Sequence, residues 1–263
     1  MIVERKKGTF SITTKTDSIT KTVEVKNGFS SAFWLGNLFS GAGIIGYGVD
    51  LTNSKRFTYP NKIYINTTDS LTKYHTFDPN DDNKGELYLH LSLPHFNFFH
   101  LAPEGEKNTN GASFWGLTAG LDYYHRKNQF INLGGTYAVG LAFPIPAAID
   151  LSGEYEFMSS WYVSLSNNHK FERFKVGYGL SFGKYFWDFK YFDWGNPEPP
   201  TREPVSKSHY ALGLVFPAYY QLGKHFNFGV VYRPTFYRPT LTNKFVYEHL
   251  ISIDFVWKIR IKK

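Results

Sequence analysis

The stretch Ile251-Ser-Ile-Asp-Phe-Val-Trp-Lys-Ile-Arg-Ile261 decides the fold, because apolar and polar side chains alternate along it. Successive side chains of a β-strand point to opposite faces of the sheet. One face of this segment therefore carries isoleucine, phenylalanine and tryptophan, and the other carries Ser252, Asp254, Lys258 and Arg260. The pattern predicts a strand with one face in an apolar medium and the other in a polar one.

The same alternation recurs in eight segments between Glu86 and the C-terminus. In the segment 131–143, bulky side chains alternate with small ones, which are Asn132, Gly134, Thr136, Ala138, Gly140 and Ala142. A narrow barrel interior accepts the small set, whereas lipid accepts the bulky set. We therefore expect the large side chains to face outward.

The connectors between these segments alternate in length. Three are short, at 126–129, 166–169 and 222–225. Four are longer, at 101–111, 144–150, 193–207 and 238–244. Outer-membrane barrels have short periplasmic turns and longer external loops. The sequence predicts an all-β chain in which residues 86–263 form an eight-stranded antiparallel transmembrane β-barrel and residues 1–85 are periplasmic.

In strand number and loop alternation, residues 86–261 resemble the eight-stranded bacterial outer-membrane barrels of the OmpA/OmpX type. The resemblance implies an outer-membrane location. This sequence departs from the pattern of those barrels at its end, where Ile261 is followed by two lysines instead of a terminal aromatic residue.

Composition agrees with a membrane barrel. Phe, Tyr and Trp make up 19% of the chain, which suits aromatic girdles at the two membrane interfaces. The mean hydropathy of -0.33 is too low for a helical membrane protein. The net charge of +7 favours contact with anionic lipid head groups, because no nucleic-acid-binding signature accompanies it. Without cysteine, the redox compartment cannot be inferred.

The first 85 residues differ in character. Thr9–Thr16 and Ile19–Val25 predict two strands with a turn at Asp17 and Ser18. The segment 28–49 has no charge and five internal glycines, which predicts a glycine-rich helical hairpin against the membrane or the base of the barrel. A buried soluble core and a spanning helix are the alternatives.

The stretch Phe33-Trp-Leu-Gly-Asn37 within this segment is followed by Phe57-Thr-Tyr-Pro60 and Ile63-Tyr-Ile-Asn66. Residues 8–66 thereby resemble the tail of PEGA-type envelope lipoproteins. The front half of such a module and an apolar signal segment are not in this sequence. We expect that the chain is truncated or that an upstream portion is removed.

Eight strands enclose a lumen that side chains can fill, so we do not expect a general porin. The charges predicted to face inward are Asp122, Glu154, Glu156, Arg173, Lys175, Arg233, Asp254 and Lys258. Unpaired buried charges are costly, so these predict an internal salt-bridge network. A gated proton or ion path is the alternative.

The aromatic run Tyr185–Trp194 is the candidate binding surface. Beyond Gly183 the parity of the bulky residues flips, which predicts a bulge and a strand that continues above the membrane. Exposed aromatic side chains there would contact a partner, glycan or lipid. The residues are Trp187, Phe189, Tyr191, Phe192 and Trp194. Packing as an extended girdle is the alternative.

Catalytic and metal sites have weaker signals. The rim candidates for an outer-leaflet lipid-modifying enzyme are His100, His209, Ser113, Ser152 and Ser208, and no spacing selects a set. Asp78, Asn80 and Asp82 begin like a calcium loop, but the rest of that motif is missing, which favours an acidic linker.

We therefore predict an envelope anchor or interaction component with no cofactor and no metal. Its expected partners are outer-membrane lipid and a protein bound by the N-terminal part or the external loops. The lipid-modifying enzyme is the first alternative, and a narrow gated channel is the second.

Overall fold

The computed structural model describes residues 7–16, 19–30, 49, 51–60, 63–65, 74–75, 82–141, 153–192, 202–242 and 244–262. The chain divides into two compact units, Met1–Asp78 and Pro79–Lys263. This boundary falls seven residues before the one expected from the sequence. The periplasmic location of the first unit stays a prediction.

The first unit is built from two-stranded antiparallel sheets. Strands β1 (Thr9–Lys15) and β2 (Thr20–Lys26) form the predicted hairpin, in which Thr9 pairs with Lys26 and Lys15 with Thr20. The short pairs are β3 (Gly28–Phe29) with β4 (Phe57–Thr58), and β5 (Tyr64–Ile65) with β6 (Tyr74–His75). One 3-10 turn, η2, covers Ser54–Arg56.

The helical prediction for 28–49 is not supported. Gly28–Phe29 is extended and pairs with β4 through Phe29 opposite Phe57. Residues 31–48 lie outside the described part of the chain. In the described residues, no helix has the length and apolar character needed to cross a membrane.

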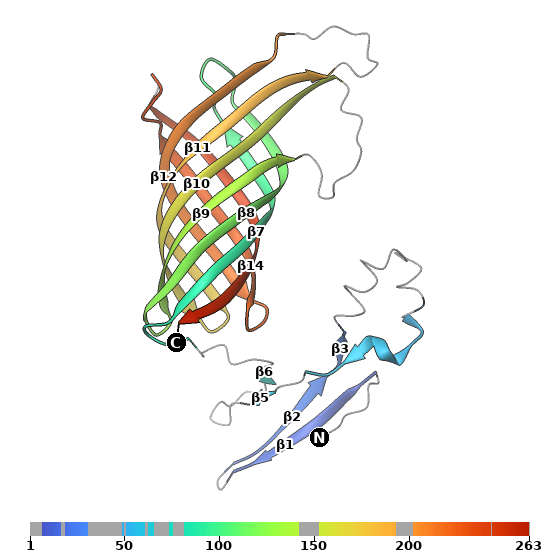
Figure 1. The fold of residues 1–263 in the computed structure, drawn as a ribbon. Helices are drawn as coiled ribbons and strands as arrows, with labels where there is room; N and C mark the ends of the chain where they lie inside the picture. Colours follow the sequence, from blue (N-terminus) through green and yellow to red (C-terminus); the bar gives the residue numbers. More distant parts are fainter. Residues whose placement is uncertain are drawn as a thin grey trace. The chain divides into compact units, whose positions relative to one another are not determined.

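The second unit is a closed antiparallel barrel of eight strands (Figure 1). The strands are β7 (Leu87–Leu101), β8 (Thr109–Arg126), β9 (Gln129–Leu141), β10 (Gly153–Phe171), β11 (Phe174–Phe192), β12 (Val205–Gln221), β13 (Phe226–Tyr237) and β14 (Phe245–Lys262). Each strand pairs with the next along the chain, and β14 closes the barrel on β7. The eight predicted segments are confirmed as strands.

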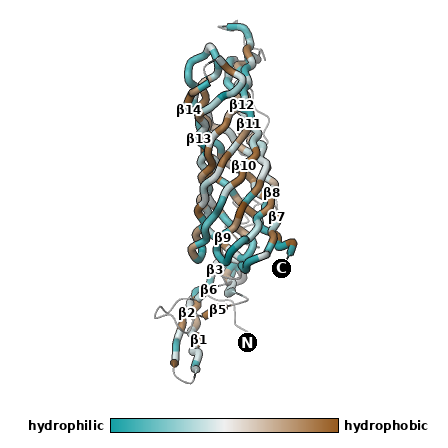
Figure 2. The backbone as a smooth tube through the Cα atoms, turned by 90° about the vertical axis from the view of Figure 1, so that its left-hand side faces the viewer, coloured by the Kyte–Doolittle hydropathy of each residue, from teal (hydrophilic) through white to brown (hydrophobic). Residues whose placement is uncertain are grey.

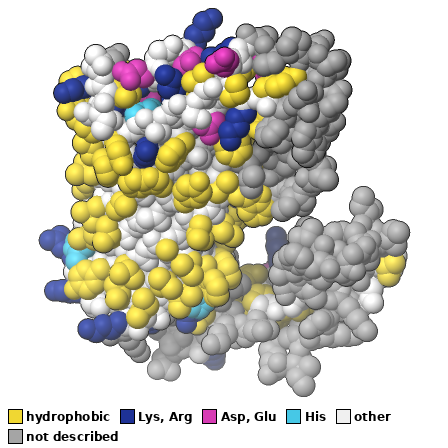
Figure 3. Space-filling view, turned by 45° about the horizontal axis from the view of Figure 1, so that its top comes forward, with side chains coloured by type: hydrophobic (Ala, Val, Ile, Leu, Met, Phe, Trp, Pro, Cys, Tyr) yellow, Lys and Arg dark blue, Asp and Glu magenta, His cyan; other side chains and the backbone are white. Residues whose placement is uncertain are grey.

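The wall has its apolar side chains on the outside. Leu180 in β11 is 66% exposed and Leu117 in β8 is 60% exposed, whereas Asp122 and Glu248 are fully buried inside. Hydrophobic and hydrophilic positions alternate along the strands in Figure 2. On the face in view, Figure 3 shows a band of apolar side chains across the wall, with charged side chains gathered above and below it. This orientation confirms the predicted direction of the bulky side chains.

The short turns all lie at the end of the barrel that also holds the C-terminus. We call this the short-turn end, and the opposite end the loop end. The β8–β9 and β12–β13 turns fall where the sequence predicted them. The predicted β10–β11 turn at 166–169 is wrong, because those residues continue β10 and the strand turns at Glu172 and Arg173. Ser166, Asn168 and Lys170 are polar because they line the lumen.

Bulges change which parity faces inward in two strands. In β7 the pairing with β14 shifts at Pro94, so Ser92 and Asn97 both face the lumen. In β8 the pairing with β9 shifts at Trp115, which has a φ of 75°. A left-handed conformation is unusual for a bulky residue, and the bulge requires it here.

One inward glycine marks a close approach between strands. A Cβ atom on Gly179 of β11 would lie 2.0 Å from the carbonyl oxygen of Leu165 in β10. No side chain fits at that distance unless the backbone moves. The small inward residues therefore set the spacing of the wall as well as the width of the lumen.

Candidate functional site in the barrel lumen

A buried ion pair lies in the half of the lumen nearer the short-turn end. Asp122 of β8 accepts from the ammonium group of Lys258 in β14 and, at 2.6 Å, from the Nδ2 of Asn132 in β9. The Nδ1 of His90 lies 3.5 Å from the same carboxylate. Lys258 also stands 4.0 Å from the ring centre of Phe130. Buried charges need such partners to offset their lost hydration.

A polar region with a small cavity follows at mid-height. Asp254 of β14 accepts hydrogen bonds from Ser92 at 3.0 Å and from Tyr219 at 3.1 Å. The guanidinium group of Arg233 lies 4.0 Å from the ring centre of Tyr162 and donates to Ser252 at 3.2 Å. Asp254 and Arg233 both line a cavity of about 30 Å³. That volume suits a few water molecules and excludes larger solutes.

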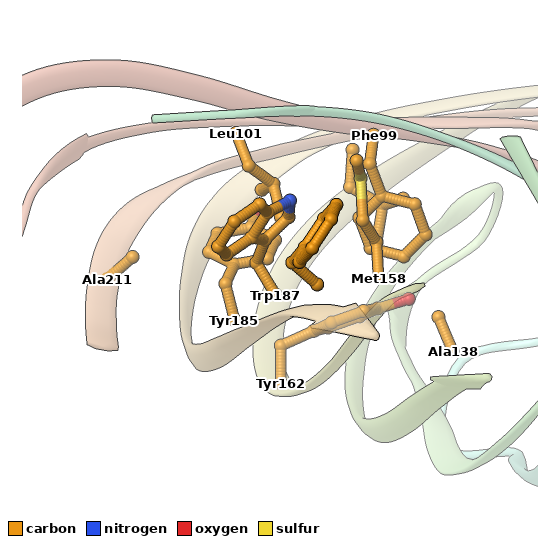
Figure 4. Close-up of a cluster of buried hydrophobic side chains, with 10 residues drawn as sticks. Phe99, Leu101, Ala138, Met158, Tyr162, Tyr185, Trp187 and Ala211 are labelled. Carbon is orange, nitrogen blue, oxygen red and sulfur yellow. The ribbon is translucent and has the colours of Figure 1, made fainter. Parts of the chain in front are cut away.

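Apolar side chains fill the lumen above this region. Figure 4 shows the rings of Tyr185 and Trp187 close to Leu101, with Phe99 and Met158 beside them. We call the cluster the aromatic plug: Phe99, Leu101, Ala138, Met158, Tyr162, Tyr185, Trp187, Phe189, Ala211 and Leu250. Its rings and aliphatic chains leave a cavity of about 10 Å³ beside Tyr162, Tyr185 and Ala211, which is no larger than one water molecule.

Three ionisable side chains connect the aromatic plug to the barrel wall. The carboxylate of Glu248 in β14 lies 2.7 Å from the Nε2 of His209 in β12 and accepts from the backbone N–H of Ala102 at 2.8 Å. Arg238 lies 3.7 Å from the same carboxylate and donates to the carbonyl oxygen of Ala102 at 2.5 Å. All three side chains are buried. The group links the end of β7 to β12 and to the residue that follows β13.

The structure brings five of the eight predicted interior charges into the lumen. They are Asp122, Lys175, Arg233, Asp254 and Lys258. Asp122 and Lys258 form a direct pair, and Lys175 donates to the side-chain oxygen of Asn227 at 2.7 Å. Arg233 lies at mid-height beside Asp254 instead of near the acids at the loop end.

The other three predicted charges lie at the ends of the barrel. Glu154 and Glu156 are exposed, and among the described residues the pairing of β10 with β9 begins at Ser160. Glu156 accepts from the indole N–H of Trp187 at 2.9 Å and from Thr109 at 2.5 Å. Arg173 is half-buried in the two-residue β10–β11 turn.

The predicted aromatic binding surface needs correction. Trp187 is 3% exposed and Phe189 is 7% exposed, and both belong to the aromatic plug. The β10–β11 pairing is regular from Gly153 to Phe192, so the bulge predicted beyond Gly183 is absent from these two described strands. The parity of the bulky residues flips because the lumen itself becomes apolar at that height. Tyr191 is half-buried, and Trp194 and the side chain of Phe192 lie outside the described residues.

The residues proposed for catalysis are not brought together. His209 faces the lumen, whereas Ser208 is exposed and His100 pairs with Asn110 at 2.6 Å. Ser113 is buried on β8, and Ser152 lies outside the described residues. Within the described ranges, no cluster of three or more His, Asp or Glu side chains is arranged to hold a metal ion.

A closed barrel with lipid-compatible side chains outside and polar side chains inside defines an outer-membrane β-barrel protein. The chain matches no protein-family profile and no curated protein sequence. The assignment to this class therefore rests on strand order and side-chain orientation.

Solved structures of similar architecture include the attachment invasion locus protein Ail of Yersinia pestis. It is 13% identical with a TM-score of 0.42, over 67% of this chain and 99% of Ail. Neisserial surface protein A gives 13% identity and a TM-score of 0.38, over 66% of this chain and 97% of that one. The N-terminal barrel domain of Pseudomonas aeruginosa OprF gives 8% identity and a TM-score of 0.34, over 68% of this chain and 100% of that domain. The resemblance of residues 8–66 to PEGA-type lipoproteins is not shown by these comparisons.

Proposed function

We propose that this protein is a non-conducting anchor in the bacterial outer membrane that holds its N-terminal unit on the periplasmic side. The observation that carries the proposal is the filled lumen. Ion pairs and hydrogen bonds occupy the half nearer the short-turn end, and the aromatic plug occupies the half nearer the loop end. A path for solutes would require both fillings to move. A sealed barrel serves as a fixed point in the membrane.

Orientation gives the anchor its direction. The short turns and the C-terminus share one end of the barrel, and Leu87 pairs there with Lys262. Short turns face the periplasm in outer-membrane barrels. The chain therefore enters the barrel from the periplasmic side, and the unit Met1–Asp78 would stand there to contact a protein partner. Outer-membrane lipid is the partner of the apolar wall.

Two measurements on the full chain test this proposal. In planar bilayers the protein should give no conductance steps, while heat-modifiable migration on a denaturing gel shows that the barrel is closed. Regular steps at modest voltage would contradict a sealed anchor. In whole cells, an epitope tag before Thr9 should resist external protease until the outer membrane is permeabilised. Cleavage of the tag in intact cells would show that the N-terminal unit lies outside the cell, which contradicts the proposed orientation.

A further inference from the structure

The residues just before β7 cover the short-turn end of the lumen. The backbone N–H of Gly85 donates to the carbonyl oxygen of Tyr124 at 2.8 Å, and the N–H of Tyr124 donates to the carbonyl oxygen of Glu86 at 3.0 Å. The buried carboxylate of Glu86 accepts from the N–H of Asn83 at 3.1 Å and from the hydroxyl of Tyr88 at 2.8 Å. This segment, 82–86, is therefore fixed against the barrel; we call it the linker segment.

Besides Glu86, the linker segment inserts the carboxylate of Asp82 into the lumen. Asp82 forms an ion pair with Lys170 of β10, and it lies 2.9 Å from the Tyr88 hydroxyl, whose single proton it shares with Glu86. The Lys170 side chain is 1% exposed, while Asp82 keeps 13% of its side chain in contact with solvent. Lys170 is thus part of the barrel wall, and Asp82 reaches it from the solvent side.

Three buried lysines from three strands lie around this position: Lys170, Lys175 of β11 and Lys258 of β14. Lys258 pairs with Asp122 inside the wall, and Lys175 has only the neutral amide of Asn227 as its hydrogen-bonding partner among the contacts of the described residues. Lys170 takes its carboxylate from the linker segment. Without Asp82 the barrel strands would hold an excess of buried positive charge.

The electrostatics of Asp82 agree with this arrangement. Burial alone would raise the pKa of its carboxyl group. The charges of Lys170, Lys175 and Lys258 outweigh burial and hold the pKa below its usual value. Asp82 is therefore bound as an anion in a cationic site.

We propose that the short-turn end of the lumen is an oxyanion-binding site that the chain occupies with its own Asp82. Displacement of the linker segment would expose Lys170 and Lys175 to a small carboxylate or phosphate from the aqueous side. Ammonium groups from separate strands fit an oxyanion that has several acceptor atoms. The site lies below the aromatic plug, so it binds its ligand without opening a path through the barrel. The inference does not depend on the anchor function.

The test is acylation of lysine in the full-length protein in lipid nanodiscs, with labelled positions counted by mass spectrometry. In the wild type, Lys170 and Lys175 should react slowly. In Asp82→Ala they should react about tenfold faster or more, and inorganic phosphate should slow the reaction again; tenfold corresponds to about 1.4 kcal/mol of protection. Asp188→Ala is the matched control, because it removes a half-buried carboxylate that lies 3.9 Å from Lys190, far along β11 from Lys175.

Two results would overturn the proposal. One is equal protection of Lys170 in the wild type and in Asp82→Ala. The other is faster labelling that phosphate does not slow, since that describes a loosened barrel end without a binding site. If Asp82→Ala loses heat-modifiable migration, Asp82→Asn carries the same test, because it removes the charge and keeps the volume.

Discussion

The outward direction of the apolar side chains is tested most directly by Leu180→Arg. Leu180 lies near the middle of β11 and is 66% exposed, flanked on the same face by Tyr178 and Phe182. In a water-soluble barrel, an arginine at so exposed a position would change the free energy of unfolding by about 0.5 kcal/mol or less. In a bilayer, arginine on the lipid face near the midplane costs about 2–4 kcal/mol. The two environments therefore predict clearly different results.

The measurement is denaturant unfolding of the protein in lipid vesicles, followed by tryptophan fluorescence and by migration on a cold gel. Phe171→Arg is the control. Phe171 is 62% exposed on the same outer wall, but it adjoins the β10–β11 turn, where the expected cost is about 0–1 kcal/mol. Equal effects of the two variants would refute a membrane-facing wall. So would a Leu180→Arg variant as stable as the wild type.

Four further predictions concern the lumen and the linker segment. Asp122→Ala should lower the free energy of unfolding by about 3–5 kcal/mol, because it leaves Lys258 buried and unpaired. Adding Lys258→Met should recover most of that loss in the same vesicle assay. If the losses of the two substitutions add instead, the two residues are not a coupled pair. Gly179→Ala should destabilise or block assembly, since its Cβ atom would meet the Leu165 carbonyl at 2.0 Å, whereas Gly135→Ala, with nothing within 4 Å, should migrate like the wild type on a gel. Trp187→Ala should lower the free energy of unfolding by about 3–5 kcal/mol, because it is a large-to-small change in a packed core. The control is Phe245→Ala, at a side chain that is 79% exposed, where the expected loss is below about 1 kcal/mol. An equally small loss for Trp187→Ala would show that Trp187 lies on the surface. Because the pKa of Asp82 is lowered, its contribution to stability is present above the ordinary value of 3.8 and is lost as the pH falls below it. The protection factors of the amides at 83–86, which correct for the intrinsic pH dependence of hydrogen exchange, should therefore be unchanged between about pH 7 and pH 5 and fall only in stronger acid. A lower protection already at about pH 5 would contradict this.

The architecture was predictable because a membrane barrel repeats one rule in every strand. Ile131, Leu133 and Tyr137 must meet lipid, while Gly134 and Thr136 must fit a narrow lumen, so period-two alternation fixes strand existence and direction together. A bulge that breaks the rule was also predictable at Pro94, since proline cannot continue the hydrogen-bonded ladder. The bulge at Trp115 has no such signal.

The rule misled where the lumen changes character. Tyr185, Trp187 and Phe189 are bulky and still face inward, because the lumen at the loop end is filled by rings instead of charges. Alternation reports which residues share a face, but it does not report which medium that face meets. The polar run 166–169 resembled a turn for the same reason, since it lines the lumen within β10.

Two carboxylates of the lumen, Glu248 and Asp82, differ in how far the sequence predicts their positions. Glu248 shares the parity of Asp254 and Lys258 in β14, so the alternation that selected those two also marks Glu248 as inward. Asp82 has no such mark, because its role depends on a connector that folds back over Lys170. Strand periodicity cannot describe a contact made by a residue outside the strands.

The two fillings of the lumen respond differently to change, and this difference separates anchoring from binding. The aromatic plug is held by packing and by the contacts of Glu248 with His209, Arg238 and Ala102, so moving the plug means disrupting a core. The seal at the short-turn end depends on Asp82, whose carboxylate a solute oxyanion can replace without breaking any strand pairing. Exchange at that end leaves the barrel closed and releases Asp82 from Lys170, while Gly85 and Glu86 stay hydrogen-bonded to Tyr124. A ligand that bound there would therefore alter how the N-terminal unit is tethered and would leave the membrane seal intact.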